Sequence, residues 1–203
     1  MIPASITAGN KMPSFQHIAT GIQVAALLAA LEEKPHLFGQ HTARATAYGS
    51  PHKAMTDIWV RFNDIGNLGP HFTDEHDSVW YPAYAELPEL TPIIFGLMAH
   101  VHGERLGGVL ITRIPPSGRI APHIDRCWHA DYYDKFYIPV RNEPGARFHF
   151  PEGDIVATPG DCYWFDNGVT HSVSNDSQAD RISLIVCIKT DNFKELKRDR
   201  LEY

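Results

Sequence analysis

Cysteine, long apolar runs and clusters of basic residues are all scarce in this 203-residue chain. The three cysteines, Cys127, Cys162 and Cys187, are an odd number and lack the paired spacing of a zinc site. No apolar run approaches the roughly 18 residues of a membrane span, and the apolar stretch 22–31 lacks the basic flank of a signal peptide. These absences argue against a disulfide-stapled fold and a membrane association, and they favour a reducing, cytoplasmic setting.

Positive charge is also in deficit, with 18 Lys and Arg against 24 Asp and Glu and a net charge of −6. The densest basic stretch, "KELKRDR" near the C-terminus, is interrupted by acids. Nucleic-acid-binding proteins usually carry a basic patch, so we expect no nucleic acid as partner. The 43% of hydrophobic residues is that of an ordinary globular protein, and the length fits one domain, residues 1–203.

The first half of the chain, residues 1–105, mixes helical patterns with irregular stretches. The spacing of apolar residues predicts one helix around residues 22–31 and another over 90–103, which has Pro near its start and Gly at its end. Alternation over residues 56–62 predicts a strand. Residues 63–84 show no period and are predicted to be a loop.

From residue 106 the pattern changes to short apolar segments that are separated by Pro, Gly, Asn and Asp. Eight segments are predicted to be strands: "GGVLITRI", "RIAPHI", "DKFYIPV", "ARFHF", "DIVATP", "DCYWF", "THSVSN" and "RISLIVCIK". This pattern predicts a mainly β fold, a double-stranded β-helix (a jelly roll or cupin-like barrel), with flanking N-terminal α-helices. We expect residues 106–190 to form this core, residues 1–105 to pack on it, and residues 191–203 to form a tail or short helix.

Histidine and aspartate are concentrated inside the predicted barrel. His123 and Asp125 are two residues apart, and such residues on a strand point to the same face, so both can bind one metal. Taken alone, the pair fits a polar strand end in solvent at least as well. His171 lies in the seventh predicted strand, which in a jelly roll is the neighbour of the second. Two histidines and a carboxylate on one side of a metal are typical of non-haem Fe(II) oxygenases, whose open positions take a cosubstrate and O₂.

Arg181 lies ten residues after His171 and begins the last apolar segment. It shares a strand face with Ser183, and the interior of a barrel is a costly place for an unpaired charge. A carboxylate ligand would pair with Arg181 bidentately and accept a further hydrogen bond from Ser183. The alternative is a surface arginine at the start of a strand.

The combined pattern of His-x-Asp, a distant His, and Arg-x-Ser resembles the Fe(II)/2-oxoglutarate-dependent oxygenase superfamily. Within it, "GVLITRIPPSGRIAPHID" and "WFDNGVTHSVSNDSQADRISLI" resemble the aspartyl/asparaginyl β-hydroxylase family, over roughly residues 107–189. The resemblance implies a dioxygenase that uses Fe(II), 2-oxoglutarate and O₂ to hydroxylate an unactivated carbon, with release of succinate and CO₂. It also implies that His123, Asp125 and His171 hold the iron, while Arg181 and Ser183 bind 2-oxoglutarate.

Two positions depart from what the resemblance implies. Animal members of the family lack the metal carboxylate, so Asp125 makes this chain more similar to the three-ligand bacterial members. The family also has an Arg-x-His pair on the third barrel strand that helps to hold 2-oxoglutarate. Lys135 and Tyr137 match that pair here; Lys135 keeps the charge without the planar fork, and Tyr137 keeps a hydrogen-bonding tip.

The resemblance further implies an amino-acid unit as substrate, either a small molecule or a residue in a polypeptide. Residues 63–84 are long for a loop, and such loops are often functional lids. Trp80 and Tyr81 in this loop, and Arg61 just before it, are candidate substrate contacts. His129, in the polar segment "RCWHADYYD", is a further candidate substrate contact; we expect it to be exposed, or to lie near the mouth of the site, rather than to bind metal. We expect a free amino acid or a derivative rather than a folded protein.

Two other classes of protein remain open. A cupin-like metal enzyme that does not use 2-oxoglutarate has no need for a buried arginine after the last ligand. A jelly-roll binding protein without activity has no reason to bring two histidines and an aspartate together. His100, His102 and Glu104 superficially resemble a cupin metal motif, but they lie at a predicted helix end, where the helix dipole favours histidine.

Overall fold

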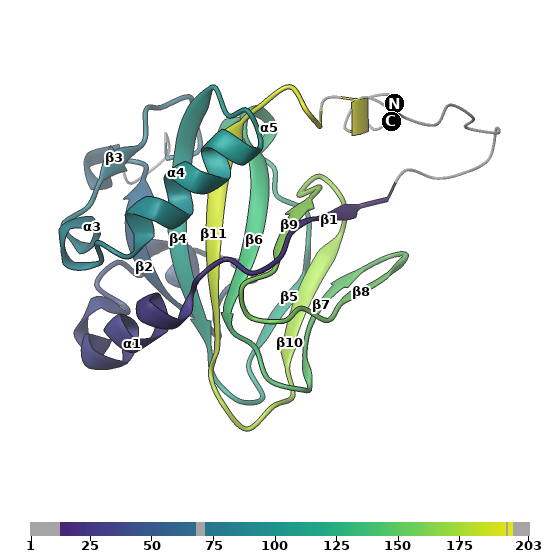
Figure 1. Ribbon diagram of the computed structural model, residues 1–203. Coiled ribbons are helices and arrows are strands. Elements are labelled where there is room, and N and C mark those ends of the chain that lie inside the picture. The colour runs from purple at the N-terminus through teal and green to yellow at the C-terminus, as the bar shows by residue number, and fades with distance from the viewer. Residues whose placement is uncertain (1–12, 68–71, 194, 197–203) are drawn as a thin grey trace.

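The computed structural model describes residues 13–67, 72–193 and 195–196 of the chain, and most of these lie in strands or in the turns between them (Figure 1). The strands are β1 (Phe15–Ala19), β2 (Thr56–Phe62), β3 (Val79–Trp80), β4 (Arg105–Ile114), β5 (Arg119–His123), β6 (Asp134–Arg141), β7 (Ala146–Phe150), β8 (Gly153–Ile155), β9 (Cys162–Phe165), β10 (His171–Asn175) and β11 (Arg181–Lys189). The helices are α1 (Ala25–Glu33), α2 (Ala43–Thr46), α3 (Ala83–Glu86), α4 (Leu90–His100) and α5 (Trp128–Tyr132), with 3₁₀ turns η1 (Pro35–Leu37) and η2 (Ile65–Asn67).

The strands form two antiparallel sheets. The larger sheet has the order β1-β9-β6-β11-β4-β2-β3, and the smaller has the order β5-β10-β7-β8. The eight strands predicted after residue 106 are all present and alternate between the sheets as in a jelly roll, except that the consecutive strands β7 and β8 pair within the smaller sheet. The predicted second and seventh strands, β5 and β10, are neighbours, with His123 opposite His171 in the register. The predicted fold class is therefore confirmed.

One face of the larger sheet carries the main hydrophobic core. Alternate residues of β11, among them Leu184, Val186 and Ile188, point into it and are buried. Helices α1 and α4 lie against this sheet (Figure 1) and contribute Leu27 and Ile94, both fully buried. Burying one such side chain stabilises the fold by about 1.5–3 kcal/mol. The other residues of β11 lie on the opposite side of the larger sheet, toward the smaller sheet.

The first half of the chain follows the sequence prediction in its regular elements. Helices α1 and α4 and strand β2 lie where the apolar spacing predicts them. Residues 63–84 hold more structure than the predicted loop, because η2, the two-residue β3 and the start of α3 lie within them. The short helix α5 was not predicted. Most of the predicted C-terminal tail, residue 194 and residues 197–203, lies outside the described residues.

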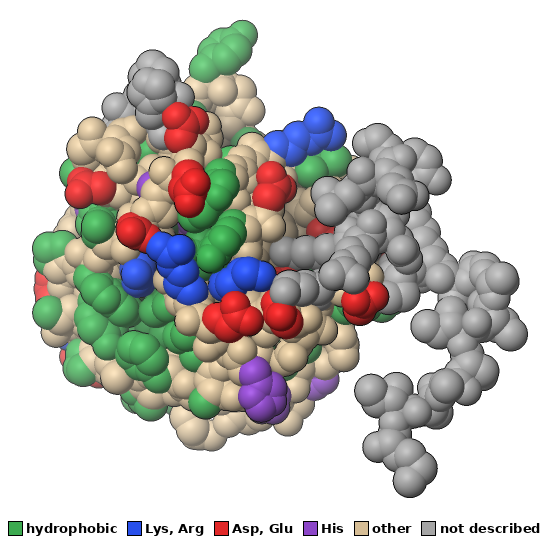
Figure 2. Space-filling view, turned by 90° about the horizontal axis from the view of Figure 1, so that it is seen from above, with side chains coloured by type: hydrophobic (Ala, Val, Ile, Leu, Met, Phe, Trp, Pro, Cys, Tyr) green, Lys and Arg blue, Asp and Glu red, His purple; other side chains and the backbone are tan. Residues whose placement is uncertain are grey.

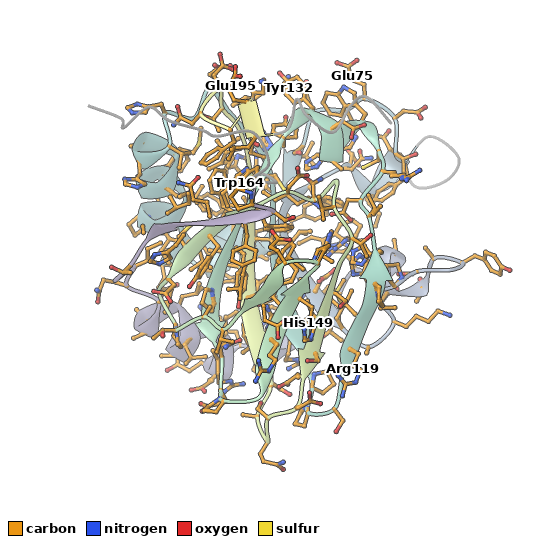
Figure 3. The ribbon with its side chains drawn as sticks, turned by 90° about the vertical axis from the view of Figure 1, so that its right-hand side faces the viewer. Glu75, Arg119, Tyr132, His149, Trp164 and Glu195 are labelled. Atoms are coloured by element: carbon orange, nitrogen blue, oxygen red, sulfur yellow. The ribbon has the colours of Figure 1, made fainter. Side chains whose placement is uncertain are left out.

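Polar side chains cover the outer face of the smaller sheet. Figure 3 looks onto the smaller sheet, whose outer face carries Arg119, which pairs with Asp176, and His149, which bonds Ser174. On the face seen in Figure 2, Lys and Arg side chains lie beside Asp and Glu. None of the described helices combines the length and hydropathy needed to cross a membrane.

Candidate metal centre

A cavity of about 570 Å³ lies between the two sheets. Its walls are formed by the inward faces of β4, β6, β11, β5 and β10, together with residues from the loop before β2 and from the segment 72–76. Apolar side chains such as Leu110, Ile120 and Val173 make up much of the lining. The candidate ligands His123, Asp125 and His171 and the candidate cosubstrate residues Arg181, Ser183, Lys135 and Tyr137 all line it.

The two predicted histidine ligands have the same hydrogen-bonding arrangement. His123 Nδ1 lies 2.8 Å from the carbonyl oxygen of Ala121, and His171 Nδ1 lies 2.7 Å from that of Val169. Each Nδ1–H therefore donates to a backbone carbonyl, which fixes the tautomer and leaves Nε2 with a free lone pair. The rings lie close together, with centroids 4.3 Å apart. Burial lowers the pKa of His171 to about 4, so that its ring is neutral, as a metal ligand must be.

Asp125 lies two residues beyond the end of β5, not on the strand as the sequence predicted. Its backbone N–H donates to the carbonyl of Asn167 over 3.0 Å, and this bond holds the chain extended beyond the strand. The carboxylate still reaches both histidines: Oδ1 lies 3.5 Å from His123 Nε2, and Oδ2 lies 3.8 Å from His171 Nε2. This set of two imidazoles and one carboxylate fits Fe(II).

Lys135 on β6 supplies a positive charge beside these ligands. Its Nζ donates to Asp125 Oδ2 over 2.5 Å. Burial alone would raise the pKa of Asp125, but the positive charge of Lys135 holds it well below its usual range. Asp125 is therefore ionised, and Lys135 offsets its charge in the metal-free protein.

A third imidazole, that of His52, lies at the same place, and sequence reasoning missed it. The ligand-capable atoms of His52, His123 and Asp125 all lie within 4.8 Å of one another. The His52 ring packs edge-on against that of His123, with centroids 4.9 Å apart at 83°. Burial lowers the pKa of His52 to about 2, so the ring is neutral. No period or ligand spacing in the sequence marks His52, because it meets the ligands only through tertiary folding.

Arg181 and Ser183 are buried side by side on the cavity face of β11, with 3% and 1% of their surfaces exposed. The guanidinium of Arg181 lies over the rings of Tyr137 and Phe148, 5.0 and 6.0 Å from their centroids. Arg181 Nε and Ser183 Oγ are buried and have no hydrogen-bond partner among the described residues. Buried donors are rarely left unpaired, so this pair fits a carboxylate that the cavity binds, such as that of 2-oxoglutarate.

His129 is buried in α5, with 7% of its surface exposed, so the expectation of an exposed position is wrong. Its Nε2 accepts a hydrogen bond from the Gly108 N–H over 3.1 Å. A side chain at residue 108 would come within 3.3 Å of the His129 ring, so glycine at this position allows α5 to pack onto β4. The ring also stacks on that of His76, with centroids 5.6 Å apart, and both residues line the cavity.

The three candidate substrate contacts from the first half of the chain have other partners. Arg61 and Trp80 face each other across β2 and β3, where Arg61 donates to the Ser78 carbonyl over 2.6 Å and lies over the Trp80 ring. Tyr81 is buried, and its hydroxyl donates to the Asn63 carbonyl over 2.6 Å. None of the three is among the residues that line the cavity.

A jelly roll whose cavity holds a His–Asp–His cluster and an unpaired arginine defines an oxygenase of the Fe(II)/2-oxoglutarate class. The chain belongs to the aspartyl/asparaginyl β-hydroxylase family, because the family profile described as Aspartyl/Asparaginyl beta-hydroxylase matches residues 26–190. The match begins far before residue 107, so the N-terminal helices and β2 are part of the family's fold. The chain is accordingly a hydroxylase that uses Fe(II), 2-oxoglutarate and O₂. No curated protein matches it.

Solved structures with the same fold are distant in sequence. An oxidoreductase of the 2OG-Fe(II) oxygenase family from Burkholderia pseudomallei is 14% identical, with a TM-score of 0.58 over 87% of this chain and 84% of that one. A Pseudomonas putida prolyl-4-hydroxylase is 15% identical, with a TM-score of 0.51 over 88% and 94%. A Trichoplax adhaerens prolyl hydroxylase, solved with a peptide of hypoxia inducible factor, is 11% identical, with a TM-score of 0.54 over 90% and 86%. At identities this low, the comparison shows a shared fold and carries no further conclusion about this chain.

Proposed function

We propose that this chain hydroxylates an unactivated carbon of a small amino-acid-like substrate, either a free amino acid or a derivative. The observation that carries the reaction class is the pair of unpartnered donors, Arg181 Nε and Ser183 Oγ, in the same cavity as His123, Asp125 and His171. When bound, Fe(II) and 2-oxoglutarate supply the activation of O₂ that attack on a C–H bond requires.

The protein's own residues hold and orient the reactants. His123 and His171 present Nε2, and Asp125 presents its carboxylate, to the metal. Arg181 donates to the distal carboxylate of 2-oxoglutarate, with Ser183 donating to the same group. The apolar side chains of the lining exclude water from the reacting carbon.

Three features of the cavity support a small substrate with amino-acid groups. Its volume lies within the ~300–1,000 Å³ typical of small-molecule sites. Arg126 lines it, is exposed, and has no ion pair among the described residues, so it is open to a substrate carboxylate. His76 Nδ1 lies 2.8 Å from the Asp74 carbonyl, so its buried, unpartnered Nε2 is an acceptor for a substrate N–H.

A residue in a polypeptide is the second candidate substrate. The specific observation in its favour is Tyr48, which lines the cavity although its side chain is fully exposed. An exposed aromatic side chain at a cavity rim is a suitable contact for a peptide that continues beyond the site. The Trichoplax prolyl hydroxylase, solved with a peptide, has this fold. A metal enzyme or binding protein that does not use 2-oxoglutarate is disfavoured by the two unpartnered donors.

The decisive experiment is a screen for succinate release with Fe(II) and 2-oxoglutarate. Free amino acids, their simple derivatives and short peptides are compared at equal concentration, with the Arg181→Ala variant as background control. We expect free amino compounds to raise succinate release above the uncoupled rate in the wild type alone. Stimulation by peptides or cell protein, without any by small amino compounds, would contradict the small-substrate proposal.

A further inference from the structure

His52 is held rigidly beside the strand that carries the first metal histidine. The Pro51 carbonyl accepts a hydrogen bond from the Ala121 N–H over 3.2 Å, which ties this loop to β5. The backbone N–H of His52 donates to Ser50 Oγ over 3.1 Å, and Ser50 Oγ donates in turn to the Arg44 carbonyl. These bonds hold the backbone that carries His52 against β5, and the docked loop places the ring edge-on against that of His123.

The ring nitrogens of His52 differ from those of the other two imidazoles. His123 and His171 each use Nδ1 on a backbone carbonyl. His52 Nδ1 is buried and has no partner among the described residues. A buried polar atom without a partner is costly, so the fold retains this nitrogen for a group that is bound in the cavity. One ring nitrogen of His52 lies within 4.8 Å of the ligand-capable atoms of His123 and Asp125.

We propose that His52 is a fourth, exchangeable protein ligand of the metal, which binds it before 2-oxoglutarate and is replaced by it. The inference rests on the metal site of the proposed function and adds a ligand to it. Two histidines and one carboxylate leave open positions, and these same positions receive the cosubstrate. A fourth protein ligand must then compete with 2-oxoglutarate. His52 should therefore strengthen the binding of the metal and weaken the binding of 2-oxoglutarate.

The first effect is on metal affinity in the absence of cosubstrate. Mn(II), which supports no turnover in this assay, is titrated into the metal-free protein and followed by the electron paramagnetic resonance signal of the free ion. Loss of groups around a metal site typically weakens binding about 10–100-fold, and we expect a loss in this range for His52→Ala. His52→Phe keeps the edge-on ring contact with His123 without a nitrogen, and it should lose the same affinity. His100→Ala, at the exposed end of α4, is the matched histidine control and should bind as the wild type does.

The second effect is on 2-oxoglutarate. Because competition is reciprocal, removal of His52 should raise the affinity of the Mn(II)-loaded protein for 2-oxoglutarate, as measured by titration calorimetry. Weaker metal binding together with tighter cosubstrate binding is a result that a folding defect cannot produce.

Unchanged Mn(II) affinity in both His52 variants would overturn the proposal, as would weaker binding of 2-oxoglutarate. His171→Ala serves as the reference for the site itself. If it also binds Mn(II) as the wild type does, the metal site of the proposed function has failed, and not only the role of His52. Neither measurement requires a known substrate, so the absence of hydroxylation does not bear on the result.

Discussion

Lys135 Nζ lies 2.5 Å from Asp125 Oδ2, so the expected metal carboxylate is already paired with a cation from the opposite sheet. Asp125 and Lys135 are mostly buried, with 19% and 17% of their side chains exposed. The ammonium is a single rotatable point charge, unlike the planar fork of the arginine that the family has at this position. The ammonium stabilises the Asp125 carboxylate while no metal is bound. When a metal pairs with that carboxylate instead, the ammonium can turn toward another anion.

Lys135→Met should therefore destabilise the metal-free protein more than the metal-loaded protein. Removing one partner of a buried ion pair costs up to about 3–5 kcal/mol, and partial exposure of this pair should place the cost near or below 3 kcal/mol. Mn(II) replaces the missing charge, so it should raise the melting temperature of Lys135→Met more than that of the wild type. Lys135→Arg is the charge-preserving control, and an equal effect of Mn(II) on all three proteins would contradict this role.

Arg181→Ala should weaken 2-oxoglutarate binding strongly. Truncation of one side of a buried charge pair costs about 2–5 kcal/mol, which corresponds to a loss of roughly 30-fold to several thousand-fold. Ser183→Ala removes a neutral donor and should cost about 1 kcal/mol. The affinity for 2-oxoglutarate is measured by calorimetry on the Mn(II)-loaded proteins. Unchanged affinity in Arg181→Ala would move the cosubstrate elsewhere, with Lys135 as the next candidate.

The sequence predicted most of the barrel because its strands are short, alternate clearly and end at Pro, Gly, Asn or Asp. The two faces of β11 illustrate this: the residues Arg181, Ser183, Ile185 and Cys187 line the cavity, and the alternate set, Ile182 to Ile188, enters the core. Alternation is a local property and needs no knowledge of the partner strand. The helix α5 is only five residues long, and a helix of one turn is too short to show a period.

Residues that depend on long-range contact could not be predicted in the same way. His52 meets His123 across 71 positions of the chain, because the loop before β2 docks on β5. Arg61 and Trp80 are adjacent because β2 pairs with β3, which satisfies Arg61 without a substrate. His129 looked exposed in a polar segment, yet Gly108 leaves room for its ring against β4. In each case, the decisive contact joins segments whose pairing the sequence does not specify.

Stability should fall at acidic pH partly because of His129. Burial lowers its pKa from an ordinary 6.5 to about 3. Between these values the unfolded chain binds a proton that the folded protein does not, so stability decreases as the pH falls from 6.5 toward 3. At pH 5 this one group lowers the free energy of unfolding by about 2 kcal/mol.

His129→Gln keeps an acceptor for the Gly108 N–H but cannot titrate in this range. Its free energy of unfolding, measured by urea denaturation, should fall less steeply between pH 7 and pH 5 than that of the wild type. His102→Gln, which removes an exposed histidine, is the control for the loss of an imidazole that is not buried. Parallel slopes for wild type and His129→Gln would show that folding does not lower the pKa of His129.

Metal binding should stabilise the wild type and leave His171→Ala almost unaffected. A ligand that binds only the folded state at about 100 times its Kd adds roughly 2.7 kcal/mol, or on the order of 5–10 °C in melting temperature for a chain of this size. Each variant is compared with its own metal-free form, so that the cost of truncating a buried ring cancels.

His149→Ala is the matched control: His149 is on β7, beside β10, and bonds Ser174 and Asp154 on the outer face of the same sheet (Figure 3). It should keep the full shift with Mn(II), and removal of the metal by a chelator should reverse it. Asp125→Ala should retain part of the shift, since two imidazoles remain. A full shift in His171→Ala would show that the metal binds without β10, and the site would then have to be sought around His52, His123 and Asp125 alone.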